Sequence, residues 1–252
     1  MKVTPIKTRI VLPPQDDILD VLDSLVPKLK ENMMVIVASK IVAIWEGRSV
    51  PLSDYPNKDE LIIQEAEKYL PREFIPGGWV MPAIKNYSII ASAGIDESNS
   101  NGYYTLWPEN PHQSSKKIWD YLRQKSGVKR LGVIITDSHT GPMRWGVLGL
   151  AIAFCGFKPL IDYRGQKDLF GREFKIETTN IPDALAGAGV FVMGEGAEST
   201  PIALIEDIPQ PIEFIESDHD NKELWKEYVI EPEIDIYGPV ILSAPWQKGG
   251  KG

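Results

Sequence analysis

Three apolar segments of this chain each end at an acidic residue. The segment SIIASAG leads to Asp96, LGVIIT ends at Asp137, and VFVMG ends at Glu195. Their alternation and their content of Val and Ile predict buried strands. An acid just past a buried strand lies at the rim of the sheet, where α/β proteins build their sites. Asp and Glu also open ordinary turns, so the pattern alone leaves a shared site and three separate turns both open.

A shared site of this kind predicts a bound cation. Gathered carboxylates repel one another unless a cation neutralises them, and hard cations such as Mg²⁺ or Mn²⁺ prefer oxygen ligands. Asp96, Asp137 and Glu195 are therefore the candidate metal ligands, and the hydroxyl of Ser138 follows Asp137 directly.

Composition narrows the class of protein. The chain has 252 residues and a formal net charge of −8, with no long basic run, so unassisted nucleic-acid binding is not expected. Its one cysteine, Cys155, excludes an internal disulfide framework, and its apolar surroundings predict a buried side chain. The opening lacks the apolar core of a signal peptide and no apolar run reaches membrane-spanning length, which predicts a cytoplasmic protein without a membrane partner.

Helical and strand-like segments alternate along the chain, which predicts a mixed α/β fold. The expected strands are residues 2–12, 33–39, 88–95, 131–136, 174–179, 190–194 and 202–207, and the expected helices open at 16, 57, 114 and 180. Residues 146–157 fit a buried helix or a buried strand equally well. From about residue 207 onward Pro and acids break the pattern, and the closing QKGGKG is expected to be mobile.

Several standard catalytic motifs are absent. The chain has no GxxxxGK[ST] loop, no GxGxxG between a strand and a helix, no HExxH and no GxSxG. What remains is GEGAES (194–199), whose backbone amides could hold phosphate, and a group of basic residues, Arg144, Arg164, Lys167 and Arg172. Metal ions and cationic side chains are the equipment of phosphoryl transfer, although each Arg could equally be a solvated surface charge.

Four motifs together resemble one known family. AGIDESN (93–99), VIITDS (133–138), DYRGQKDLFGRE (162–173) and VMGEG (192–196) occur in the order and spacing of the coenzyme F420-0:γ-glutamyl ligase family. The resemblance covers about residues 5 to 206. It implies a mixed α/β fold of the F420 ligase-like type over residues 1–206, an extension over 207–252, and an intertwined homodimer. It also implies GTP, or ATP, as cosubstrate with Mg²⁺ or Mn²⁺, in a reaction that joins L-glutamate to the cofactor F420-0.

The resemblance assigns roles to particular residues. The implied metal ligands are Asp96, Asp137, Ser138 and Glu195. The implied nucleotide-binding residues come from four segments: Arg9, Ile10, Val11 and Leu12; Ser39 with Lys40; Asn99; and Met193, Gly194, Gly196, Ala197 and Thr200. The candidate catalytic residues are Asp137 and, from the group of basic residues, Arg144 and Arg172.

Two positions depart from the family pattern. Ile44 stands where the family has a nucleotide-binding Lys, and Gly141 stands near the place of an Arg. Lys40 lies on the same segment as Ile44 and could supply the missing charge. These departures leave open GTP or ATP, and F420-0 or a folate as acceptor. They also leave open a relative that binds nucleotide and metal without catalysis, and a metal-dependent phosphohydrolase.

The implied reaction has two steps. A carboxylate of the acceptor attacks the γ-phosphate to give an acyl phosphate and a nucleoside diphosphate. The amine of glutamate then displaces phosphate and forms the amide. Both steps need positioning and charge stabilisation rather than a protein nucleophile.

Overall fold

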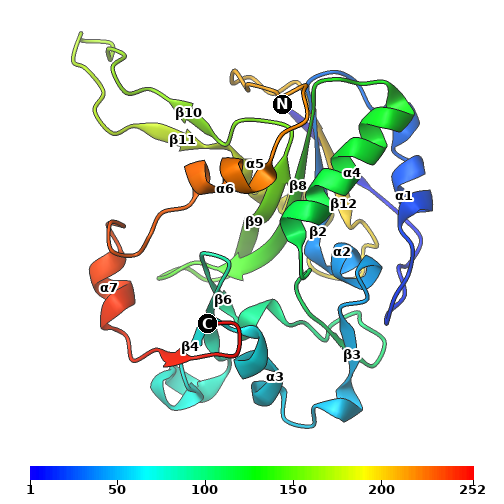
Figure 1. Cartoon of the computed structure of the whole chain (residues 1–252), viewed down its shortest axis with the longest axis vertical. Helices are drawn as coiled ribbons and strands as arrows, with labels where there is room; N and C mark the ends of the chain where they lie inside the picture. The colour runs from blue at the N-terminus through cyan, green and yellow to red at the C-terminus, as the bar shows by residue number, and fades with distance from the viewer.

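A five-stranded mixed sheet forms the centre of the molecule in the computed structural model, which describes residues 1–252. Its strand order is β1-β12-β2-β8-β9 (Figure 1). The central pair β2–β8 is parallel and the other neighbours are antiparallel. The strands are β1 (Lys2–Ile6), β2 (Met33–Ala38), β8 (Leu131–Thr140), β9 (Val147–Cys155) and β12 (Ile202–Glu206). The prediction of a mixed α/β fold is confirmed.

The sheet is buried on both faces because its strands alternate apolar side chains between two cores. Val35 and Val37 of β2 join one hydrophobic cluster, while Met34 and Ile36 join another. Helices α1 (Leu19–Asp23) and α4 (Pro111–Ser126) pack into the first cluster. Helices α5 (Ile181–Met193) and α6 (Asn221–Tyr228) pack into the second. Helix α4 ends at Gly127, whose φ of 75° gives the left-handed cap that a glycine adopts without strain.

A smaller lobe, residues 49–105, lies below the carboxyl ends of β2 and β8 in Figure 1. It contains helix α3 (Lys58–Glu65) and a third hydrophobic cluster. Helix α2 (Ser39–Trp45) leads from the large sheet into it. Its strands are β3 (Ser49–Pro51), β4 (Lys68–Tyr69), β5 (Pro82–Lys85), β6 (Ser88–Ala91) and β7 (Tyr103–Thr105).

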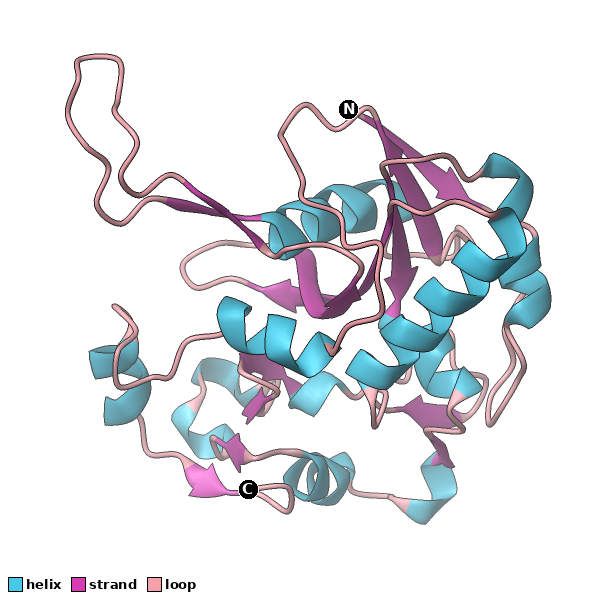
Figure 2. Ribbon diagram, turned by 45° about the horizontal axis from the view of Figure 1, so that its top comes forward, coloured by secondary structure: helices cyan, strands magenta, loops and turns pink.

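A long hairpin, the arm, projects from the body of the molecule (Figures 1 and 2). Its base is the pair β10 (Leu160–Asp162) and β11 (Thr178–Asn180), and residues 163–177 form its loop. Leu169 and Phe170 at the tip are 98% and 95% exposed. The tip of the arm therefore presents two apolar side chains to water.

The structure corrects several expected elements. Residues 190–193 are not a strand but the last turn of α5. Its buried positions, Ile181, Leu185, Ala186, Gly189, Val190 and Met193, follow the spacing of a helix face, which outweighs the local preference of VFVM for strand. Residues 146–157, which fitted a helix or a strand equally well in the sequence, contain strand β9. The first strand ends at Ile6 rather than at residue 12. Of the expected strand 174–179, only residues 178 and 179 are paired, as part of β11.

The C-terminal extension runs over the surface as a strap. After α6 and α7 (Gly238–Ser243), strand β13 (Gln247–Lys248) pairs with β4, adding a fourth strand to the sheet of the small lobe. The N–H groups of Gly249, Gly250 and Lys251 then bond to carbonyls at the end of α3, with distances from 2.8 to 3.0 Å. The expected mobile tail is instead held at the small lobe.

Two smaller expectations can be compared with the structure. Cys155 is fully buried, as expected for a small apolar side chain. None of the helices combines the length and the apolar character that a membrane span requires.

Candidate functional site

Asp137 lies within β8, directly after the residues of this strand that pair in parallel with β2. Its Oδ2 accepts a hydrogen bond from the indole Nε1 of Trp107, and its Oδ1 accepts one from the backbone N–H of Ser138 at 2.9 Å. Burial raises the pKa of Asp137 to about 6, and repulsion from Asp96 adds to this, while Trp107, Ser138 and Ser39 oppose it by donating hydrogen bonds. The carboxylate therefore has donors but no cationic partner.

Asp96 lies beside Asp137, at the end of the small lobe that faces the large sheet. Lys40, from the first turn of α2, places its Nζ 2.7 Å from Oδ2 of Asp96. Burial alone would raise the pKa of Asp96, but the bonds from Lys40 and Ser98 outweigh it and lower the pKa. Two carboxylates thus share one pocket edge, and only one of them has a cation next to it.

Glu195 reaches the same edge from the loop between α5 and β12. The hydroxyl of Ser138 donates to Oε2 of Glu195 at 3.2 Å. In the same loop the carbonyl oxygen of Gly196 accepts a hydrogen bond from Nδ2 of Asn99 at 3.0 Å. The hydroxyl of Thr200 donates to the carbonyl of Met193 at 2.5 Å and closes the loop. Several of the predicted site residues, although far apart in the sequence, are therefore joined in pairs by hydrogen bonds near the edge of the sheet.

The N-terminal segment lies next to this loop. The N–H of Thr8 donates to the carbonyl of Ser199 at 3.0 Å, which places the predicted residues 9–12 beside the Gly-rich turn. Arg9 itself is held by Asp16 and Asp20, each at 2.7 Å, and both contacts raise its pKa. Ile10 and Leu12 are exposed and Val11 is buried.

Neither predicted catalytic arginine joins the group. Arg144 lies in the exposed turn between β8 and β9, where it donates only to the carbonyl of Met143. Arg172 lies in the projecting arm, where its backbone N–H is bonded to Asp168. The basic residues that crowd together in the sequence are thus divided between two separate loops.

The two departures from the family pattern have structural explanations of different kinds. Ile44 is 1% exposed and belongs to the first hydrophobic cluster, so this position faces the core and presents no group to a ligand. Gly141 lies in the β8–β9 turn, where an added Cβ would meet only a side-chain atom of Leu148 at 3.7 Å. Space for a side chain exists there.

Two residues of the site were missed by the sequence analysis. Trp107 comes from the polar segment before α4 and carries no motif that would have revealed its contact with Asp137. Ser98 donates to Asp96 from its hydroxyl at 2.8 Å and offers its carbonyl to Lys40 at 2.7 Å. Ser98 lies within AGIDESN, so its place two residues after an acid was a usable signal, because such residues often bond back to the acid.

The donor set suits a hard divalent cation, although the acids do not form a ready cluster. Nowhere in the chain do three or more His, Cys, Asp or Glu side chains gather closely enough to hold a metal ion. The oxygens of Asp96, Asp137, Ser138 and Glu195 are nevertheless the type that Mg²⁺ and Mn²⁺ prefer. The raised pKa of Asp137 marks a buried carboxylate that a cation would stabilise. The metal site remains a prediction.

Comparison with known proteins identifies relatives over most of the chain. A family model described as F420-0:Gamma-glutamyl ligase matches residues 5–207. A coenzyme F420:L-glutamate ligase of Methanopyrus kandleri is 30% identical over 233 residues, 86% of this chain and 90% of the relative. The coenzyme F420:L-glutamate ligase of Methanocaldococcus jannaschii is 34% identical over 77% of each chain. That of Methanosarcina mazei is 34% identical over 79% of this chain and 82% of the relative.

Proposed function

The chain belongs to the F420-0:γ-glutamyl ligase family, and from that premise we propose that it adds L-glutamate to F420-0 at the expense of a nucleoside triphosphate. The observation that supports this proposal is a series of pairwise contacts beside a Gly-rich loop: Asp96 repels Asp137, and Ser138 donates to both Asp137 and Glu195. A folate acceptor is the alternative within the same chemistry.

The proposed reaction needs no protein nucleophile. An oxygen of the acceptor carboxylate bonds to the γ-phosphorus, and the bond to the departing nucleoside diphosphate breaks. The amine of glutamate then bonds to the acyl carbon, phosphate leaves, and the amine loses its proton. The protein's part is to position three substrates and to keep water from the acyl phosphate.

The residues of the site would divide this work. A divalent cation, when bound through Asp96, Asp137, Ser138 and Glu195, would neutralise charge on the phosphate oxygens. The backbone amides of residues 193–200 would face the triphosphate. Lys40 supplies the positive charge nearest to Asp96. Ile44 cannot contribute, because it is buried in the core.

We further propose that the chain acts as a homodimer. Leu169 and Phe170 are almost fully exposed on the projecting arm, and Ile176 at the other side of the loop is 82% exposed. Covering these side chains with a second copy would remove them from water. A dimer would also give Arg172 a role, since it lies too far out on the arm to join the site of its own chain.

The test is a direct search for product. The protein is incubated with Mn²⁺, L-glutamate, GTP or ATP, and F420-0 or a folate, and mass spectrometry looks for the glutamylated acceptor. Asp137→Asn should abolish the product and leave the circular dichroism spectrum unchanged. Asp54→Asn, at an exposed Asp on the small lobe, is the matched control and should retain activity.

Other outcomes select other functions. Release of phosphate without glutamate and acceptor would identify a phosphohydrolase. Binding of GTP and Mn²⁺ without turnover would identify a non-catalytic relative. Full activity of Asp137→Asn would overturn the role given to this carboxylate.

A further inference from the structure

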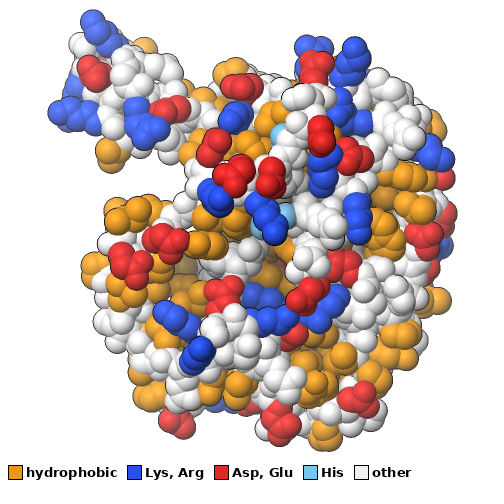
Figure 3. Space-filling view, in the orientation of Figure 1, with side chains coloured by type: hydrophobic (Ala, Val, Ile, Leu, Met, Phe, Trp, Pro, Cys, Tyr) orange, Lys and Arg blue, Asp and Glu red, His pale blue; other side chains and the backbone are white.

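A polar cavity of about 610 Å³ lies between the small lobe, the start of α4 and the C-terminal strap. Apart from Trp107 and two prolines, all its lining residues are polar or charged. Acidic and basic side chains gather around a hollow in the middle of the face shown in Figure 3. Apolar or flat aromatic ligands gain little from such walls, whereas a small charged ligand finds partners on every side.

The cavity shares a wall with the site already described. The side chain of Trp107 lines the cavity, and its Nε1 donates to the carboxylate of Asp137. One residue, Trp107, therefore borders the cavity and also contacts Asp137.

Most charges around the cavity are already paired with one another. Lys85 and Arg48 both contact Glu65, at 2.8 and 2.6 Å, and Lys251 contacts Glu109 at 2.7 Å. Burial lowers the pKa of Lys85, and Glu65 opposes this shift. Each of these cations already has a carboxylate partner, which leaves the recognition of a ligand to other groups.

Three charged lining side chains have no ion pair: Lys222, Glu67 and Asp220, whose carboxylate accepts the backbone N–H of Lys222. Lys222, at the start of α6, is exposed and its ammonium has no partner, and Glu67 accepts only the backbone N–H of Asn86. The start of α4 adds donors: Asn110 makes no side-chain cap, and the N–H groups of His112 and Gln113 have no partner. A carboxylate is the natural ligand for a helix start with free N–H groups.

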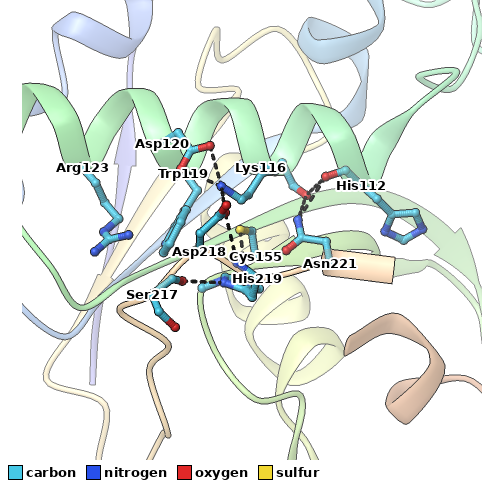
Figure 4. A network of polar contacts seen from close by, with 12 residues as sticks. His112, Lys116, Trp119, Asp120, Arg123, Cys155, Ser217, Asp218, His219 and Asn221 are labelled. Atoms are coloured by element: carbon cyan, nitrogen blue, oxygen red, sulfur yellow. Dashed lines mark hydrogen bonds and ion pairs between the residues drawn. The ribbon is translucent and has the colours of Figure 1, made fainter. Parts of the chain in front are cut away.

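A buried side chain at the same wall also has an unused group. Asn221 is 5% exposed and donates to the carbonyl of His112 and to the hydroxyl of Ser115, at 3.0 and 3.1 Å (Figure 4). Its Oδ1 has no hydrogen-bond partner. Buried oxygens without a partner are rare in folded proteins, and Asn221 is also one of the residues that line the cavity.

We propose that this cavity binds L-glutamate, with a carboxylate at Lys222 and the start of α4 and the ammonium group near Glu67. This inference rests on the proposed function, which supplies the substrate. Glutamate carries two carboxylates and one ammonium, which matches a wall that offers free charges of both signs and almost no apolar surface. The C-terminal strap thereby becomes part of the substrate site, because it contributes Lys222, Asn221 and Lys251.

The first test measures binding alone. Equilibrium dialysis of the full chain with radiolabelled L-glutamate is expected to show about tenfold weaker binding for Lys222→Glu and for Glu67→Gln. Glu67→Gln keeps the acceptor oxygen for Asn86 and removes only the charge. Lys226→Ala, on the same helix and paired with Glu223 outside the cavity, is the control and should bind normally.

The second test separates a binding role from a structural one. Glutarate lacks the amine, so the wild type should bind it more weakly than glutamate, and Glu67→Gln should lose this preference. In the ligase assay both variants should raise KM for glutamate, with kcat and KM for nucleotide unchanged. If both variants bind glutamate normally and keep ligase activity, the cavity is not the glutamate site, although the proposed function stands. If the wild type shows no ligase activity but the variants still bind glutamate more weakly, the glutamate site stands and the proposed function fails.

Discussion

The indole Nε1 of Trp107, in the segment between the small lobe and α4, donates a hydrogen bond to Oδ2 of Asp137 in β8. Trp107 is 2% exposed, and its contact joins a side chain near the start of α4 to the carboxyl end of β8. The orientation of the Asp137 carboxylate therefore depends on a side chain that lies outside β8. The geometry of the site depends on how the two lobes are packed.

Replacing Trp107 with Phe should lower kcat about tenfold, because it removes the donor to Asp137; the smaller ring also leaves a space in the core, an effect that the control shares. Trp119→Phe is the matched control. Trp119 is also buried, and its Nε1 donates to the carbonyl of Leu131 at 2.7 Å, away from the acids. Both variants should lose similar stability in thermal melts. Equal loss of kcat in both would show that Trp107 acts only through the fold.

Lys40→Met should raise KM for the nucleotide several-fold, since it removes the positive charge nearest to Asp96. The effect on the free energy of unfolding should stay below about 1 kcal/mol, because the side chain of Asp96 is 48% exposed and water screens the pair. Steady-state kinetics and urea unfolding measure the two quantities. Lys30→Met, which removes a surface pair with Glu206, is the control. A normal KM for nucleotide in Lys40→Met would exclude Lys40 from the nucleotide site.

Gly249→Ala should lower the melting temperature by several degrees. A Cβ on Gly249 would lie 2.1 Å from the carbonyl oxygen of Ala66, so the strap would have to lift from the end of α3. Gly187→Ala in α5 meets open space and should stabilise the protein by up to about 1 kcal/mol, because alanine favours helix. Differential scanning calorimetry compares them. A neutral Gly249→Ala would mean that the strap end does not hold the small lobe.

His112 should make the protein less stable as the pH drops from about 6.5 toward 4, whereas Asp137, whose pKa burial raises to about 6, contributes in the opposite direction. Burial lowers the pKa of His112 to about 4, and Lys222 adds to the shift while Asp220 opposes it. In this pH range the unfolded chain takes up a proton at His112 that the folded chain does not, so protonation favours unfolding. His112→Asn should reduce this loss of stability by about 1 to 2 kcal/mol, because water partly screens the charge on a half-buried side chain. Urea unfolding of both proteins at pH 7 and at pH 5 measures this loss. If the free energy of unfolding changes by the same amount in both proteins, His112 does not contribute.

Local patterns were sufficient for several elements. The alternation and length of residues 33–38 and 131–136 identified strands that are buried on both faces, and the sequence ending at Gly127 identified a helix and its cap. The segment at 190–193 shows the limit of such patterns. Its Val and Phe favour strand locally, but helix α5 already runs from residue 181 and its buried face continues through Met193.

The sequence by itself determined which residue types were available to the site: acids after apolar segments, a Gly-rich loop, and the motifs of a known family. It could not decide which of them meet. That was settled by the pairing of β2 with β8 and by the packing of the small lobe, which bring Lys40, Asp96 and Trp107 to Asp137 and send Arg144 and Arg172 elsewhere. The physical reason is that local spacing controls backbone conformation over a few residues, whereas contacts between residues 30 to 97 positions apart depend on burying all the apolar faces at once.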